Sequence, residues 1–198
     1  MNINFRWDIL NYFVTKYGFK SYLEIGVQDY YCNCDKIQVE DKTSVDPAPR
    51  NKCDYVMTSD EFFAQLPADK KYGLIFIDGL HHDYQVERDI INSLYHLEDG
   101  GIIMCHDCLP TEESQTSRHI PPGAWTGDGF RAFAKLRCTR PDLFMCVLDT
   151  DWGCGIIKRG SQQVYNNGQI PPVLDWKYYT EHRNEMLNVV PVSEIENI

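Results

Sequence analysis

Short apolar runs that end in polar residues alternate with segments of helical periodicity, and this alternation restricts the possible folds more than any other feature of the chain. The clearest runs span 72–78 (YGLIFID) and 102–106 (IIMCH), and between them Val86, Ile90 and Leu94 recur at helical spacing. Such runs are typical of strands that are buried on both faces of a parallel sheet. A helix between two of them predicts a right-handed crossover, which indicates the α/β class.

The remaining segments follow the same alternation. Further strands are predicted at 21–26, 42–46 and 53–57, and helices at 5–16, 58–65, 84–97, 127–137 and 176–187. Two more strands, at 143–149 and 153–158, are joined by a tight turn and predict an antiparallel hairpin. We therefore expect an α/β fold: a Rossmann-like, mostly parallel seven-stranded sheet with a C-terminal antiparallel hairpin strand and helices on both faces.

The chain has 198 residues, the size of one ordinary domain. Residues 1–160 carry the alternation and form the predicted domain. In residues 161–198 the pattern is interrupted by Pro171, Pro172 and Pro191. We expect this segment to be an arm that packs on the domain or on a partner subunit, so that it could support a homo-oligomer.

Composition excludes several classes of partner. Lysine and arginine total 19 against 29 acidic residues, which leaves a net charge of −10. Nucleic acids and anionic membranes are held through basic clusters, so neither is an expected partner. No run approaches the ~20 apolar residues of a membrane-spanning helix, and the first residues lack the pattern of a signal peptide. We expect a cytoplasmic protein.

The eight cysteines allow two interpretations. Cys32, Cys34, Cys53, Cys105 and Cys108 include pairs at spacings that zinc sites use. Cys105, however, lies inside an apolar run, where a cysteine behaves as a small hydrophobic residue. We therefore favour reduced thiols over a zinc site.

Polar residues gather where the predicted strands end. They are Glu24, Gly26, Asp46, Ser59, Asp60, Asp78, His81, His82, His106 and Asp107. In an open parallel sheet, ligands bind outside the carboxyl ends of the strands. These residues are therefore the candidate site.

The turn after the first predicted strand indicates the class of ligand. Gly26 is followed by VQDYY, without the later glycines that let a backbone approach a pyrophosphate, and Asp29 would repel a diphosphate. Asp46 lies 46 − 26 = 20 residues further on, the spacing at which an acidic residue binds ribose hydroxyls. A ribose contact without a phosphate site favours S-adenosylmethionine (SAM) over NAD.

Six segments in order resemble class I SAM-dependent methyltransferases, most closely the bacterial macrocin- and mycinamicin-type sugar O-methyltransferases. They are YLEIGV (22–27), SVDP (44–47), MTSDEFF (57–63), IFIDGLH (75–81), GGIIMCHD (100–107) and WGCGII (152–157). The resemblance covers residues 20–160 and implies SAM as the cofactor.

The resemblance also assigns roles around the cofactor. Glu24 and Gly26 would border the methionine part of SAM, and Asp46 would hold the ribose. Ser59 and Asp60 would flank the adenine. The acceptor would be a small hydroxylated molecule such as a sugar or glycoconjugate precursor.

A metal site and a general base follow from the same resemblance. Asp78, His106 and Asp107 would bind a divalent ion, magnesium or manganese, and Asp78 would also lie beside the cofactor. His81 and Asp78 would be the catalytic residues, with His81 as the base. His106 stands where the family has an acidic ligand, and imidazole suits magnesium poorly. Independently of the resemblance, carboxylates at the ends of adjacent strands can share a cation, and histidine accepts protons near neutral pH.

The segment 109–127 is rich in Pro, Ser, Thr and Glu and predicts a long loop. Loops of this length in small domains are often functional. We expect it to cover the acceptor, with Trp125 as a surface on which a sugar stacks; a plain surface loop is the alternative.

Two other functions remain open at this point. The residues Asp78, His81, His82, His106 and Asp107 would also suit a metal-dependent hydrolase. The altered first motif and His106 would suit a SAM-binding module without catalysis.

Overall fold

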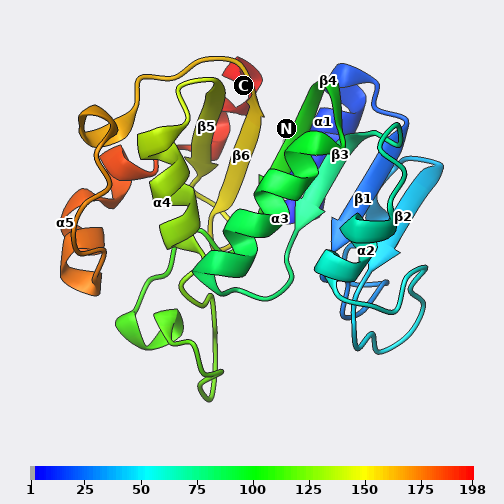
Figure 1. Ribbon diagram of the computed structural model, residues 1–198, viewed down its shortest axis with the longest axis horizontal. Helices are drawn as coiled ribbons and strands as arrows, with labels where there is room; N and C mark the ends of the chain where they lie inside the picture. The colour runs from blue at the N-terminus through cyan, green and yellow to red at the C-terminus, as the bar shows by residue number, and fades with distance from the viewer. Residues whose placement is uncertain (1–2) are drawn as a thin grey trace. The chain divides into compact units, whose positions relative to one another are not determined.

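The computed structural model describes residues 3–198 and contains both helices and strands (Figure 1). The strands are β1 (Ser21–Ile25), β2 (Asp41–Val45), β3 (Tyr72–Ile77), β4 (Leu97–Cys105), β5 (Leu143–Leu148), β6 (Cys154–Arg159) and β7 (Val189–Val190). The α-helices are α1 (Arg6–Tyr17), α2 (Ser59–Gln65), α3 (Asp83–Tyr95), α4 (Phe130–Thr139) and α5 (Trp176–Met186). Short 3-10 helices are η1 (Cys34–Lys36), η2 (Glu113–Thr116), η3 (Tyr165–Gly168) and η4 (Val192–Asn197).

The strands form a seven-stranded sheet in the order β2-β1-β3-β4-β6-β5-β7. Four of the five strand pairings described are parallel, so the predicted fold class is confirmed. The described chain divides into two compact units. The first unit comprises the chain up to Leu80 together with Arg88–Cys105, and the second comprises His81–Glu87 and His106–Ile198.

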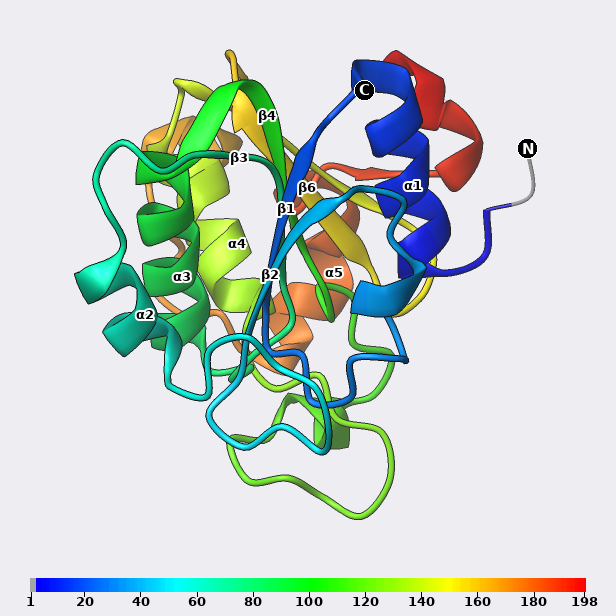
Figure 2. The same cartoon turned by 90° about the vertical axis from the view of Figure 1, so that its right-hand side faces the viewer.

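In the first unit, β1 pairs in parallel with β2 on one side and with β3 on the other. Strand β3 pairs in parallel with β4. Every residue of β1 and β3 is buried, as expected for strands with covered faces. Figure 2 shows α1 on one face of these strands, and α2 with the part of α3 from Arg88 onwards on the other.

One predicted strand does not form. Of the residues 53–57, only Tyr55 makes a bridge, in parallel with Val45. The amide of Ser44 in β2 donates to the carboxylate of Asp54 at 2.9 Å, and its hydroxyl donates to the same oxygen at 2.6 Å. A side chain therefore takes the position that a backbone carbonyl of a longer strand would occupy.

Strand β4 begins earlier than the predicted 102–106. It includes Gly100 and Gly101, which the sequence suggested would break the pattern, and its pairing with β3 shifts between Tyr72 and Leu74. Gly100 has a φ of +78°, which glycine adopts without strain. The glycines therefore form an irregularity inside the strand.

In the second unit, β5 and β6 form the predicted antiparallel hairpin, with Leu143 opposite Arg159 and Leu148 opposite Cys154. The segment from residue 161 onwards contributes η3, α5, β7 and η4 to this unit, and β7 pairs in parallel with β5 at Val147 and Leu148. Whether this segment also contacts a partner subunit stays a prediction.

Two further features concern cysteines and membranes. None of the eight cysteines forms a disulfide in the described part of the chain, and six of them are buried. Among the helices of the described residues, none combines the length and the apolar character needed to span a bilayer.

Helix α4 packs on β6 through a close contact at Gly155. A Cβ atom at this position would lie 2.6 Å from Phe133 Cε2 and 2.9 Å from Cys108 Sγ. Both neighbours are buried. We therefore expect Gly155→Ala to lower the free energy of unfolding by about 1–3 kcal/mol, the usual effect of overpacking a core, as measured by urea denaturation.

Gly160→Ala is the matched control, because a Cβ there would lie 3.4 Å from Phe144 Cβ, an ordinary van der Waals distance. We expect this variant to stay within ~0.5 kcal/mol of the wild type. Equal stability of the two variants would contradict the packing argument.

Candidate active site

The first unit brings the exits of β1, β2 and β3 together. Gly26 follows β1 with a φ of +87°, and a Cβ at this position would lie 2.2 Å from the carbonyl oxygen of Asp78. The amide of Gly26 donates to Val45 O at 2.8 Å, and the amide of Asp78 donates to Ile25 O at 2.8 Å. Only glycine permits this approach, so the structure explains its place at the first turn.

Asp46, at the exit of β2, holds the first turn through its carboxylate. Oδ2 accepts the backbone amide of Gln28 at 2.8 Å, and Oδ1 accepts that of Ala48 at 2.7 Å. The residue is half-buried. Each carboxylate oxygen can accept more than one hydrogen bond, so the ribose contact predicted for Asp46 remains chemically open.

Glu24 is buried behind this turn, with 1% of its surface exposed. Its Oε2 accepts the Tyr22 hydroxyl at 2.6 Å and the Asn33 side-chain amide at 3.0 Å. Burial raises the pKa of Glu24 to about 7, although both hydrogen bonds act in the opposite direction. The structure therefore places this predicted cofactor residue inside a polar network and not on the surface of the turn.

Ser59 and Asp60 form the start of α2, which Thr58 caps by accepting the amide of Glu61. Asp60 pairs with Arg88 of α3, and both side chains are exposed. The residues predicted to flank adenine thus lie at a helix start, and one of them already has a cationic partner.

Asp78 follows β3, and Arg6 of α1 reaches toward it, with Nε 3.9 Å from Oδ2. Arg6, Tyr22 and Asn33 were not predicted as part of the site. Arg6 stands 72 positions before Asp78, and no local pattern links the two.

In the second unit, His81 contacts Asp107. Nδ1 lies 3.3 Å from Oδ2, and the two side chains are 15% and 11% exposed. The imidazole stacks on Trp125, with the ring centres 4.8 Å apart and the planes 21° apart. Gly127, with a φ of +62°, passes so close that a Cβ would lie 2.2 Å from the carbonyl oxygen of His81. The predicted base is therefore held on three sides.

His106 lies between two carboxylates. Its Nδ1 is 3.4 Å from Asp107 Oδ2, and its Nε2 is 3.6 Å from Asp151 Oδ2. This position suits a protonated imidazole, which can donate from both nitrogens. A metal ligand needs a free lone pair on one ring nitrogen, and the metal role expected for His106 stays a prediction.

We therefore assign no step to a metal ion. A metal role for Asp78 and Asp107 stays a prediction. Asp151 was missed because it lies in the β5–β6 turn, 44 residues beyond Asp107 in the sequence. Its own φ of +44° is the unusual backbone angle of a tight turn, which residue types alone do not reveal.

The loop 109–127 is fastened by buried polar contacts. The carbonyl of Gln115 accepts the amides of Thr126 at 3.1 Å and Gly127 at 3.0 Å, which closes the loop on itself. The side-chain oxygen of Gln115 accepts the amide of Thr111 at 2.8 Å. Trp125 donates its indole N–H to Ser117 O at 2.6 Å.

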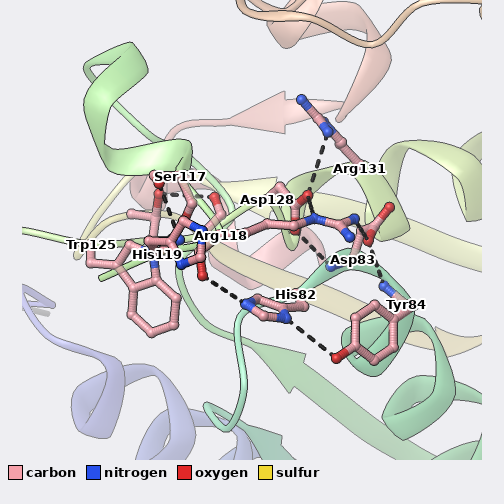
Figure 3. A network of polar contacts seen from close by, with 11 residues as sticks. His82, Asp83, Tyr84, Ser117, Arg118, His119, Trp125, Asp128 and Arg131 are labelled. Atoms are coloured by element: carbon pink, nitrogen blue, oxygen red, sulfur yellow. Dashed lines mark hydrogen bonds and ion pairs between the residues drawn. The ribbon is translucent and has the colours of Figure 1, made fainter. Parts of the chain in front are cut away.

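Asp128 is the centre of a second network, which fixes the rest of the loop (Figure 3). It accepts Arg118 Nε at 2.8 Å and the amide of Asp83 at 2.9 Å, and Arg131 lies 3.4 Å away. His82 Nε2 lies 3.0 Å from Arg118 O. His82 therefore serves this network, which weakens the hydrolase alternative that needed it beside His81.

Comparisons with known proteins support the fold. A family model described as a methyltransferase domain matches residues 41–108. No curated protein matches the chain. The chain is similar to a candidate O-methyltransferase from Klebsiella pneumoniae, with 14% identity, a TM-score of 0.59, and 79% of this chain and 80% of that chain covered.

Two further solved structures are similar. An O-methyltransferase from Bacillus cereus in complex with SAH shows 15% identity and a TM-score of 0.56, covering 77% of this chain and 78% of that chain. A candidate caffeoyl-CoA O-methyltransferase from Staphylococcus aureus shows 17% identity and a TM-score of 0.57, covering 81% and 85%. These likenesses show the methyltransferase fold. They leave the macrolide-sugar group a prediction.

The burial of Glu24 generates a testable pH dependence. Its pKa is about 7 in the folded protein against 4.5 as the ordinary value. The folded state then binds more protons between these values, so the contribution of Glu24 to stability is fully present below pH 4.5 and is lost as the pH rises through 7. Glu24→Gln removes this dependence, and we expect stability relative to wild type to rise by roughly 3 kcal/mol across that range.

Urea denaturation of both proteins at pH 5 and pH 8 measures the effect. Glu61→Gln is the control, because Glu61 is exposed and its hydrogen bonds to Thr58 lower its pKa. A constant difference between Glu24→Gln and wild type at both pH values would show that Glu24 does not titrate in this range.

Proposed function

We propose that the protein is a SAM-dependent O-methyltransferase that acts on a small hydroxylated acceptor. The observation that supports this most is the orientation of His81 by Asp107 and Trp125 within a methyltransferase fold. The match of the methyltransferase domain model to residues 41–108 includes Asp46, Asp78, His81 and Asp107.

The donor groups of the first turn fit SAM better than a dinucleotide. Asp29 accepts the amide of Tyr31 at 3.0 Å, and a hydrogen bond with Asn51 lowers the pKa of its carboxyl group. An ionised carboxylate at this position repels a diphosphate and favours a cationic ligand. We infer that Asp46 binds the ribose hydroxyls, while Gly26 leaves space for the methionine part and Ser59 and Asp60 flank the adenine.

When bound, SAM supplies an electrophilic methyl group on a positively charged sulfur. His81 accepts the proton of the acceptor hydroxyl as the oxygen bonds to the methyl carbon and the carbon–sulfur bond breaks. His81 Nδ1 lies 3.3 Å from Asp107 Oδ2, and we infer that the carboxylate faces the tautomer with its proton on Nδ1, which leaves the lone pair on Nε2. The products are the methylated acceptor, S-adenosylhomocysteine (SAH) and a proton on His81.

The fastened loop has a role in this scheme. Trp125 covers one face of His81 and restricts the approach of water to the base. A ring that is held in place loses little freedom when the acceptor binds. A sugar or glycoconjugate precursor is the acceptor class we propose.

SAH binding tests the cofactor assignment. We expect calorimetric titration of the wild type with SAH to show saturable binding, and Asp46→Asn to weaken it at least tenfold, because a neutral amide binds ribose hydroxyls less strongly. Asp41→Asn, at the opposite end of β2, is the control. Binding by Asp46→Asn within twofold of the wild type would remove the ribose assignment.

Methyl transfer from labelled SAM to hexoses and nucleotide sugars tests the base. We expect His81→Gln to lower kcat by about 10²–10⁴, the usual contribution of a general base, and Asp107→Asn to lower it less. His119→Gln is the control, because this histidine is exposed on the loop. SAH binding without transfer to any acceptor would support the non-catalytic module instead.

A further inference from the structure

A cavity lies wholly within the second unit. Its volume is about 760 Å³, and its walls come from the end of α4, from β5, from residues 161–167 and from α5. This volume lies in the range of small-molecule sites, ~300–1,000 Å³. None of its wall residues belongs to the site described above.

Arg137 of α4 is a buried cation in the wall of this cavity. It is 7% exposed, and burial lowers its pKa. Nη1 donates to the side-chain oxygen of Gln162 and, at 3.4 Å, to Gln163 O. Nε is buried and has no hydrogen-bond partner among the described residues.

No carboxylate of the described residues forms an ion pair with Arg137. Glu185 belongs to the same wall. A buried guanidinium without an anion is costly, and a chain with a net charge of −10 has carboxylates to spare. An arginine with a structural role only would be expected to have one of them as its partner.

The other wall residues offer neutral polar groups. Gln162 donates its side-chain amide to Arg140 O at 2.8 Å, which leaves its oxygen toward Arg137. The hydroxyls of Tyr165 and Tyr178 lie 2.8 Å apart, and the ring of Tyr178 lies 4.3 Å from that of His182. Amides and hydroxyls suit the hydroxyl groups of a polar metabolite, whereas a guanidinium suits an oxyanion.

We propose that this cavity binds a small polar molecule through a carboxylate or phosphate group that contacts Arg137. The bound oxyanion would accept hydrogen bonds from the guanidinium nitrogens that the protein leaves available. The site is independent of the proposed methyltransferase function, because no residue is shared between the two.

Titration with inorganic phosphate and, separately, with acetate tests the proposal. The experiments use the full chain saturated with SAH, at constant ionic strength maintained with chloride. We expect saturable binding of at least one anion, weakened at least tenfold in Arg137→Gln. Arg140→Gln is the matched control, since Arg140 is nearby and already paired with Asp142 at 2.6 Å. Binding of phosphate alone indicates a phosphate ester, and binding of acetate alone indicates a carboxylate.

A second measurement covers the case in which Arg137→Gln does not fold. The ¹⁵Nε–H signal of Arg137, assigned by its loss in Arg137→Lys, should shift in a saturable manner when the anion is added to the wild type. No binding of either anion, equal binding by Arg137→Gln, or a ¹⁵Nε–H signal that does not move would overturn the proposal. Displacement of SAH by phosphate would place the anion elsewhere and would also overturn it.

Discussion

The close approach of two backbones at Gly26 is the constraint on which the first half of the candidate site depends. The chain leaving β1 passes so near the carbonyl of Asp78 that no Cβ fits between them. This contact fixes where β3 ends, and the turn after Gly26 brings the amide of Gln28 to Asp46. The second unit uses the same device at Gly127, which lies against the carbonyl of His81. The backbones of Asp78 and His81 are therefore positioned by close backbone contacts at Gly26 and Gly127, in addition to the contacts of their side chains.

Charge is organised differently in the two kinds of polar cluster. Asp128 is 1% exposed and is neutralised by Arg118 and Arg131, so that cluster is closed and structural. Asp46 instead accepts the neutral backbone amides of Gln28 and Ala48, and no ion pair among the described residues involves its carboxylate. Arg137 is the reverse case, a buried cation that forms no ion pair with a carboxylate of the described residues. The ion pairs of Asp128 hold the loop, whereas Asp46 and Arg137, the charged residues at the two proposed ligand sites, form no ion pair among the described residues.

The parts of the fold that were predicted from sequence are those set by local pattern. The run 72–78 corresponds to a wholly buried strand, and the run 143–158 to an antiparallel hairpin. The strand predicted at 53–57 does not form because the side chain of Asp54 accepts the Ser44 amide, which would otherwise pair with a backbone carbonyl in the sheet. The pattern of apolar residues does not reveal such competition between a side chain and the backbone. In the site, Asp46, His81 and Asp107 were predicted as strand-end residues. Arg6 and Asp151 come from distant segments, and Asn33 comes from the loop after β1, where no pattern marks it.

Asp107 lies close to two histidines, and this arrangement affects the proposed role of His81 as a base. Its Oδ2 lies 3.3 Å from His81 and 3.4 Å from His106, so one oxygen serves both rings. If His106 carries a proton, the Asp107 carboxylate is already partly neutralised and stabilises a protonated His81 less strongly. Asp151 faces the other ring nitrogen of His106, so the positive charge of a protonated His106 would be shared between two carboxylates. The basicity of His81, which follows β3, therefore depends on three other groups. Asp107 and His106 follow β4, and Asp151 comes from the turn between β5 and β6.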